Sequence, residues 1–208
     1  MSIRPIETRY NGYRFRSRTE ARWAVFFDAI YMRYHYEVSG YDLGGIAYLP
    51  DFRLKGEGTF PHAEYVEVKP GTPTRYEWNK AVLLCYGLES AVHIFAGEPG
   101  LNTRVWTLEF ADSYLPEFLV GSRQADTTHA MPPYACCYSL WAQCKVCTRI
   151  DLARRWHNQN RPPENYCNFC YAEGDGVLDM ESPALLAAFT SARSARFEHG
   201  ETPEGTNN

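Results

Sequence analysis

The chain has 208 residues, of which 45% are hydrophobic and 22% are charged, and its formal net charge is −4. This composition is typical of a globular protein with a sizeable core and excludes a uniformly basic nucleic-acid binder. No apolar run reaches the roughly 20 residues of a membrane span, so we expect a cytoplasmic protein without a membrane partner.

Charge is distributed unevenly along the sequence. Residues 1–35 carry seven arginines against three acids, and residues 143–161 carry five basic residues against one acid. Residues 171–208 are acidic, with seven acids against two arginines. The two basic segments are compatible with contacts to a phosphate backbone, although solvated helix faces explain them equally well.

Helical signals occur at three places. Ser17-Arg18-Thr19-Glu20 has the form of a capping box and predicts a helix to about residue 32, with Trp23, Phe26, Phe27 and Ile30 facing the core. Thr74-Arg75-Tyr76-Glu77 is a second capping box and predicts a helix that ends near Gly87. An alanine-rich third helix is predicted from about residue 182 to residue 197.

Strands are predicted between these helices. Residues 34–38 form one, residues 46–69 form a hairpin with its turn near Lys55-Gly56-Glu57-Gly58, and residues 91–95 and 104–110 form two more. This order predicts an α/β fold with a mixed central sheet flanked by helices. We expect a core domain over residues 1–120, a linker over 121–133, a cysteine-rich module with its helix over 134–198, and a disordered tail over 199–208.

The cysteine-rich module carries a metal-binding pattern. Cys144-x2-Cys147 and Cys167-x2-Cys170 are separated by 19 residues, which is typical of a four-cysteine zinc site. A disulfide pair and a redox CxxC motif are the alternatives, but cytosolic disulfides are rare and a redox motif needs no second copy. The spacing therefore predicts a structural Zn²⁺ in a small zinc ribbon, although glycine is missing from both knuckles.

Two carboxylates are predicted to meet beside a lysine. A period of two places Glu67 and Lys69 on one face of a strand, and the hairpin would bring Asp51 beside that strand. Burying carboxylates and a lysine where a sheet meets the core is costly unless they have charged partners or a metal ion. We therefore expect a divalent cation and a water molecule at this place.

These residues resemble the PD-(D/E)xK nuclease superfamily. The match is Pro50-Asp51, fifteen intervening residues and Glu67-Val68-Lys69, preceded by a helix with Glu20 and followed by a helix with Lys80. The sequence of residues 13–24 is similar to that of phage-encoded members of this superfamily. The resemblance covers roughly residues 10–98. It implies a restriction-endonuclease-like core, and the cytoplasm of a bacterial host if the chain is phage-encoded.

The resemblance also implies a mechanism. Asp51 and Glu67 would hold Mg²⁺ or Mn²⁺ with the Val68 carbonyl as a candidate third ligand, Lys69 would assist the attacking water, and Glu20 would be an additional ligand to the metal or to water. Mg²⁺ prefers oxygen ligands, and a bound ion lowers the pKa of its water. The expected activity is hydrolysis of phosphodiester bonds in DNA. A protein partner at the zinc ribbon and a homodimer are left open.

Each of these residues also has a simpler explanation. Asp51 suits a turn after proline, Glu67 and Lys69 suit an exposed strand, Glu20 suits a capping box, and Lys80 suits a solvated helix.

Two other functions remain open. A degenerate core with a zinc ribbon would bind nucleic acid without cleaving it. His62-Ala63-Glu64 followed by a CxxC motif matches part of a zinc deaminase signature, but glutamine stands where proline is expected and the second CxxC is unexplained.

Overall fold

The computed structural model describes residues 7–55, 63–110, 136–155, 167, 169–174 and 176–197. The predicted linker over 121–133 and the predicted tail over 199–208 lie outside these residues. The helices are α1 (Arg18–Ala29), α2 (Arg75–Leu88) and α3 (Pro183–Ser194). The strands are β1 (Thr8–Tyr10), β2 (Tyr13–Phe15), β3 (Tyr34–Tyr36), β4 (Tyr41–Asp42), β5 (Ala47–Tyr48), β6 (Phe52–Leu54), β7 (Glu64–Lys69), β8 (Val92–Ala96), β9 (Arg104–Leu108), β10 (Cys136–Cys144), β11 (Ile150–Arg155) and β12 (Leu178–Asp179).

Eight of the described strands form a mixed sheet at the centre of the protein. Its order is β11-β10-β9-β8-β7-β6-β3, and β12 pairs with β10 outside this path. Only the β7–β8 pair among these described strands is parallel, and α2 makes the crossover between its two members. The prediction of an α/β fold with a mixed central sheet is therefore confirmed. Two small hairpins, β1–β2 and β4–β5, accompany the sheet.

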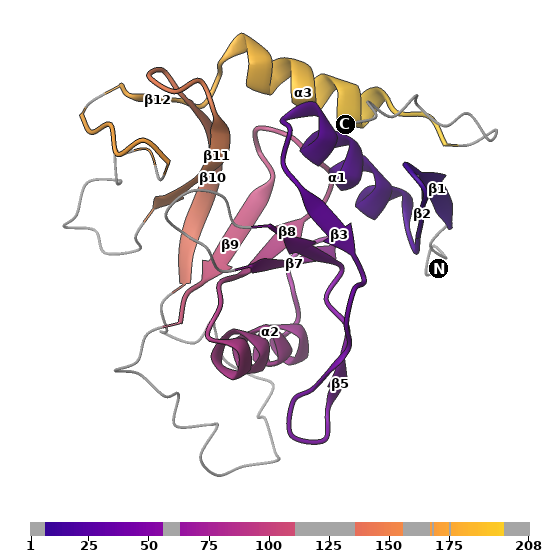
Figure 1. Cartoon of the computed structure of the whole chain (residues 1–208). Helices are drawn as coiled ribbons and strands as arrows, with labels where there is room; N and C mark the ends of the chain where they lie inside the picture. Colours follow the sequence, from indigo (N-terminus) through magenta and orange to yellow (C-terminus); the bar gives the residue numbers. More distant parts are fainter. Residues whose placement is uncertain are drawn as a thin grey trace.

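The helices lie on opposite faces of this sheet. Figure 1 shows α1 and α3 next to each other on one face and α2 on the other. Two hydrophobic clusters correspond to these two layers. The α1 side contains Val66 and Val68 of β7, whereas the α2 side contains Tyr65 of the same strand. Alternation along β7 thus decides which side chains face which layer.

Helix α1 begins where its capping signal predicts. Ser17 is the N-cap, and its side chain accepts a hydrogen bond from the Glu20 N–H at 3.2 Å. The helix ends at Ala29, slightly earlier than predicted, and Tyr31 follows with a φ of 59°. Of the side chains predicted to face the core, Trp23, Phe26 and Phe27 are fully buried, and Ile30 is partly buried against the same cluster.

Helix α2 has a complete capping box. The Thr74 side chain accepts from the N–H of Glu77, and the Glu77 carboxylate accepts from the N–H of Thr74 at 2.7 Å. The helix extends one residue past Gly87 and ends with Glu89 in the left-handed conformation.

The cysteine-bearing segment shares the sheet and the core with the preceding residues. Strand β10 pairs with β9 on one side and with β11 on the other. Trp141 of β10 packs against Phe26 at a centroid distance of 4.8 Å, and Phe189 of α3 stacks on the same ring at 4.8 Å and 10°. The four-cysteine region is therefore continuous with the aromatic core around α1. None of the helices in the described ranges has the length and hydropathy to cross a membrane.

Candidate functional site

Asp51 lies where the β6–β7 ladder ends. The last pair of that ladder joins Phe52 to Val66. The N–H of Tyr65 donates to the carbonyl of Ala91, on the β8 side of β7. Because N–H groups along a strand point alternately to its two neighbours, the N–H of Val68, three residues further on, points toward β6. Beyond the ladder, Asp51 Oδ2 accepts this N–H at 2.7 Å. The aspartate is thus fixed to the backbone of the strand that carries Glu67.

Asp51 and Glu67 form a buried acidic pair. Their exposed fractions are 6% and 4%. Burial raises the pKa of Asp51 well above its usual range, and the charges of Glu67 and Glu20 and a hydrogen bond with Glu67 raise it further. The backbone N–H of Val68 acts in the opposite direction. The predicted convergence of two carboxyl groups from neighbouring segments is therefore present in the structure.

Lys69 lies between two carboxylates. Its Nζ is 3.5 Å from Glu67 Oε2 and 3.6 Å from Glu77 Oε1. Burial raises the pKa of Glu77, but hydrogen bonds from Thr74 and the charge of Lys69 outweigh it, and the pKa is lowered overall. The start of α2 therefore holds the lysine beside Glu67. The simpler explanation of an exposed strand pair does not fit, because Glu67 is buried.

Glu20 is buried, and its carboxylate is engaged by other groups. Oε1 accepts from the Ser17 hydroxyl at 2.6 Å, and Oε2 accepts from the Tyr36 hydroxyl at 2.6 Å and from the Arg16 N–H at 3.1 Å. The structure thus brings Glu20 close enough to influence the pKa of Asp51 while its oxygens serve the start of α1.

Sequence reasoning missed Tyr48 and Arg16 at this site. The Tyr48 hydroxyl on β5 bonds to Glu67, and burial followed by the charge of Glu67 raises the pKa of Tyr48. The Nζ of Lys80 lies 4.7 Å from the centroid of the Tyr48 ring, which gives this lysine a cation–π contact. Arg16 Nη2 lies 3.5 Å from Asp51 Oδ1 and also pairs with Glu37. The positions of Tyr48 and Arg16 depend on tertiary packing, so no local sequence motif indicates them.

The four cysteines form two knuckles of the same design. In the first, the N–H of Val146 bonds to Cys144 Sγ at 3.3 Å, and in the second the N–H of Phe169 bonds to Cys167 Sγ at 3.4 Å. Burial raises the pKa of the Cys144 thiol, but hydrogen bonds from the backbone N–H groups of Cys147 and Val146 outweigh this effect and lower it to about 7. The local backbone therefore favours a thiolate at Cys144.

The sulfur atoms are spaced for one metal ion. Cys144 and Cys170 Sγ are 3.7 Å apart, and Cys147 and Cys167 Sγ are 3.6 Å apart. A tetrahedral ion with metal–sulfur bonds of about 2.3 Å requires sulfur–sulfur separations of about 3.8 Å. Among the described residues, these four thiols are the group of three or more candidate ligands that lies within 4.8 Å. The cluster can thus hold a structural metal such as zinc. Glu20, Asp51 and Glu67 do not form such a group, because their carboxylate oxygens do not all lie within 4.8 Å of one another.

Each knuckle ends in a non-glycine residue with positive φ, at the position where the glycine missing from the sequence would be favoured. Thr148 has a φ of 63° and Tyr171 a φ of 56°. Their N–H groups close equivalent turns, to the carbonyl of Cys144 at 2.9 Å and to that of Cys167 at 3.0 Å. The left-handed conformation is costly for β-branched and aromatic residues, so both knuckles carry backbone strain.

We therefore expect Thr148→Gly to stabilise the protein by about 0.5–1 kcal/mol, because glycine adopts the left-handed region without a steric penalty. Thermal denaturation of the zinc-loaded protein measures the change. Val146→Gly is the control, since Val146 is exposed, lies in the same knuckle and lacks a positive φ. A lower melting temperature for Thr148→Gly than for Val146→Gly would contradict this explanation.

The other candidate motif is only partly described. His62 of the deaminase-like pattern lies outside the described residues, and Glu64 Oε2 lies 2.9 Å from Nε2 of His93. Comparison of the chain with family models, curated proteins and solved structures finds no match.

Proposed function

We propose that the protein is a metal-dependent nuclease that hydrolyses phosphodiester bonds of DNA, with Mg²⁺ or Mn²⁺ held by Asp51 and Glu67. The observation that carries the proposal is the convergence of these two buried carboxyl groups, since Asp51 is held by the N–H of Val68 on the strand that carries Glu67. Two carboxylates in a low-dielectric site repel each other, and a divalent cation removes this repulsion. A strongly raised carboxyl pKa in such a place is typical of functional sites.

The residues present fit an oxygen-binding ion. Asp51 and Glu67 supply carboxylate oxygens, and the backbone N–H and C=O of a strand residue point to the same neighbouring strand, so the Val68 carbonyl is directed toward the side of Asp51. When bound, the ion would activate a water molecule and neutralise charge on the scissile phosphate.

The remaining side chains position and balance this site. Lys69 donates toward Glu67 from a half-buried position, where its ammonium group can hold the attacking water and offset negative charge on the phosphate. Tyr48 fixes Glu67 by its hydroxyl. Glu20 acts as a positioning residue, because its oxygens hold the loop with Arg16 and Ser17 that approaches Asp51.

We also propose that the four cysteines hold Zn²⁺ in a structural role. A site closed by four protein thiolates has no open position for a substrate or a water molecule. Its task is therefore to fix the knuckles to β10 and β12, where the Lys145 N–H bonds to the Val177 carbonyl at 2.9 Å.

A cleavage panel tests the nuclease proposal. Supercoiled, linear, single-stranded and branched DNA, together with RNA, would be incubated with zinc-loaded protein with and without added Mg²⁺ or Mn²⁺. Glu67→Gln and Lys69→Gln are expected to lower the rate by about 10²–10⁴-fold, because each removes a group in contact with the reacting centre. Glu181→Gln makes the same kind of change at an exposed position before α3 and should leave the rate unchanged.

The omission of added Mg²⁺, rather than strong chelation, keeps the zinc cluster intact during this comparison. Salt-sensitive DNA binding without cleavage in either metal would favour a non-catalytic nucleic-acid-binding protein instead. Cleavage that is undiminished in both site variants would remove the proposed mechanism.

A further inference from the structure

A cavity of about 450 Å³ lies on the α1 side of the sheet, beside the first cysteine knuckle. Its wall combines the end of α1 and the turn after it, the ends of β6 and β7, and the segment 148–152. Glu64 and Glu67 are three residues apart on β7 and so point to opposite faces. The cavity is therefore separate from the acidic pair around Asp51. We call it the knuckle pocket.

The floor of the knuckle pocket is a fixed polar chain. His93 is 1% exposed, and its Nε2 lies 2.9 Å from Glu64 Oε2. Its Nδ1 lies 2.8 Å from the Thr107 hydroxyl, which in turn lies 2.6 Å from the hydroxyl of Ser139. Four neighbouring strands thus hold the Glu64 carboxylate in one orientation. Burying these groups is costly unless they stay bonded, so the floor is rigid.

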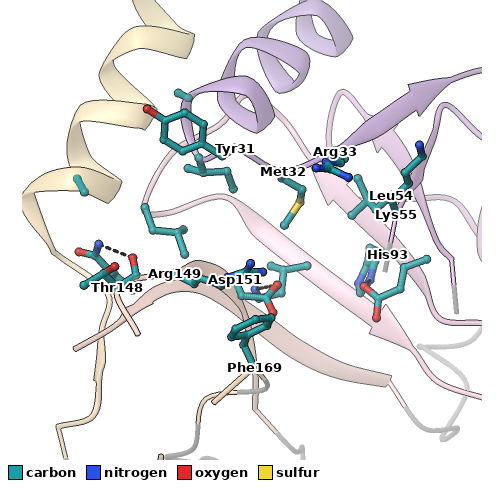
Figure 2. A pocket seen from close by; sticks show the side chains of 17 residues that line it. Tyr31, Met32, Arg33, Leu54, Lys55, His93, Thr148, Arg149, Asp151 and Phe169 are labelled. Carbon is teal, nitrogen blue, oxygen red and sulfur yellow. Dashed lines mark hydrogen bonds and ion pairs between the residues drawn. The ribbon is translucent and has the colours of Figure 1, made fainter. Parts of the chain in front are cut away.

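The opposite side of the knuckle pocket offers a second oriented carboxylate and a planar group. Asp151 Oδ1 accepts from the N–H of Leu152 at 2.8 Å. The Arg149 guanidinium lies over the Phe169 ring at 3.6 Å from its centroid. Figure 2 shows Arg149, Asp151 and Phe169 across the cavity from His93. Two carboxylates in fixed positions favour a ligand that carries N–H donors.

Cations gather at the rim. Arg33 and Lys55 are both exposed, and their backbones are joined by a hydrogen bond from the Lys55 N–H to the Arg33 carbonyl at 3.0 Å. Figure 2 shows the two side chains at the same end of the cavity as His93. With Arg149, the lining carries three cations against the carboxylates of Glu64 and Asp151. Adjacent cations at a rim favour an anionic group such as a phosphate.

We propose that the knuckle pocket binds a nucleoside monophosphate whose base carries an amino group. The phosphate lies between Arg33 and Lys55, and the base enters between the aliphatic side chains of Met32 and Leu54, with its N–H groups directed to the oriented carboxylates. The volume falls within the range of about 300–1,000 Å³ that is common for ligand sites. This proposal does not depend on the nuclease activity, because the acidic pair lies on the other face of the sheet.

Calorimetric titration of the full, zinc-loaded chain with dGMP, dAMP and dCMP tests the proposal. Divalent metal is left out, so that the acidic pair on the other face has no ion to attract the phosphate. We expect saturable binding of one nucleotide per chain, weaker binding of dTMP, which lacks an amino group, and weaker binding of inorganic phosphate. The double variant Arg33→Gln/Lys55→Gln should weaken binding by about tenfold or more, because it removes both charges that face the phosphate.

The double variant Arg53→Gln/Arg75→Gln is the matched control. It removes the same charge from two exposed arginines that do not line the knuckle pocket, and it should change the affinity by less than about twofold. The proposal is overturned by the absence of saturable binding up to roughly 5 mM nucleotide. It is also overturned if both double variants weaken binding equally, or if phosphate or dTMP binds as tightly as dGMP.

Discussion

Asp51→Asn is expected to lower the rate of the proposed DNA cleavage sharply and, without divalent metal, to make the folded protein more stable. The change removes a charge that is destabilised by burial and by Glu67 and Glu20, while the amide oxygen of asparagine can still accept the N–H of Val68. The same change removes a carboxylate that the proposed ion requires, so the cleavage rate should fall by about 10³-fold or more. Thermal denaturation and a cleavage assay on one preparation measure both effects.

The stability gain should depend on pH. The folded chain keeps a proton on Asp51 at pH values where the unfolded chain, with an aspartate pKa of about 3.9, has lost it. The stability of the metal-free wild type should therefore fall as the pH rises from about 4 through the folded-state pKa. Asp51→Asn lacks this component, so its advantage should grow over the same interval.

Glu181→Gln is the control for this comparison, because Glu181 is an exposed acid remote from Asp51 in sequence and is not among the groups that shift its pKa. Added Mg²⁺ should raise the melting temperature of the wild type and leave that of Asp51→Asn nearly unchanged. Equal stability of the wild type and Asp51→Asn at every pH would contradict the assignment of Asp51 as a strained buried acid.

Loss of zinc is the second large effect that we expect. Cys167→Ser should lower the zinc content below one ion per chain and reduce the free energy of unfolding by several kcal/mol, since structural zinc contributes roughly 10 kcal/mol or more of apparent binding free energy in small sites. The knuckles also anchor β12 and approach the core through β11, whose Leu152 is buried. Metal analysis by mass spectrometry and denaturation with and without a zinc chelator give the measurement.

Cys85→Ala is the matched variant for this experiment. Cys85 is a buried thiol on α2 that lies outside the cluster, so its removal should cost little stability and leave one zinc ion per chain. If the chelator shifts the melting temperature of Cys167→Ser as strongly as that of the wild type, the cluster does not hold the ion that stabilises the fold.

Local signals in the sequence predicted the helices well. Ser17 and Thr74 are the N-caps of α1 and α2, because a capping side chain acts on backbone groups within one turn. The antiparallel pairing of Phe52 with Val66 also follows the predicted hairpin, since alternation and a turn are local features. The proximity of Asp51 to Glu67 depends only on that hairpin, so it could be predicted from the sequence.

Pairing between strands that are far apart in the sequence could not be predicted from local signals. The pairing of Cys136–Cys144 with β9, which extends the sheet, was not anticipated, because strand partners far apart in the chain leave no local trace. The contacts of Tyr48, Arg16 and His93 have the same origin. The β1–β2 hairpin did have a signal, since Asn11-Gly12, with φ values of 46° and 78°, is a favoured two-residue turn.

The stacking of Phe189 on Phe26 has a practical consequence for anyone who wishes to shorten the protein. A chain that ended after Phe110 would lose α3 and β10 together, so Phe26 would be uncovered and β9 would become an open edge. Strands left open in this way recruit other chains and promote aggregation. Biochemists who study the part of the chain that carries Asp51 and Glu67 should therefore keep the C-terminal helix attached.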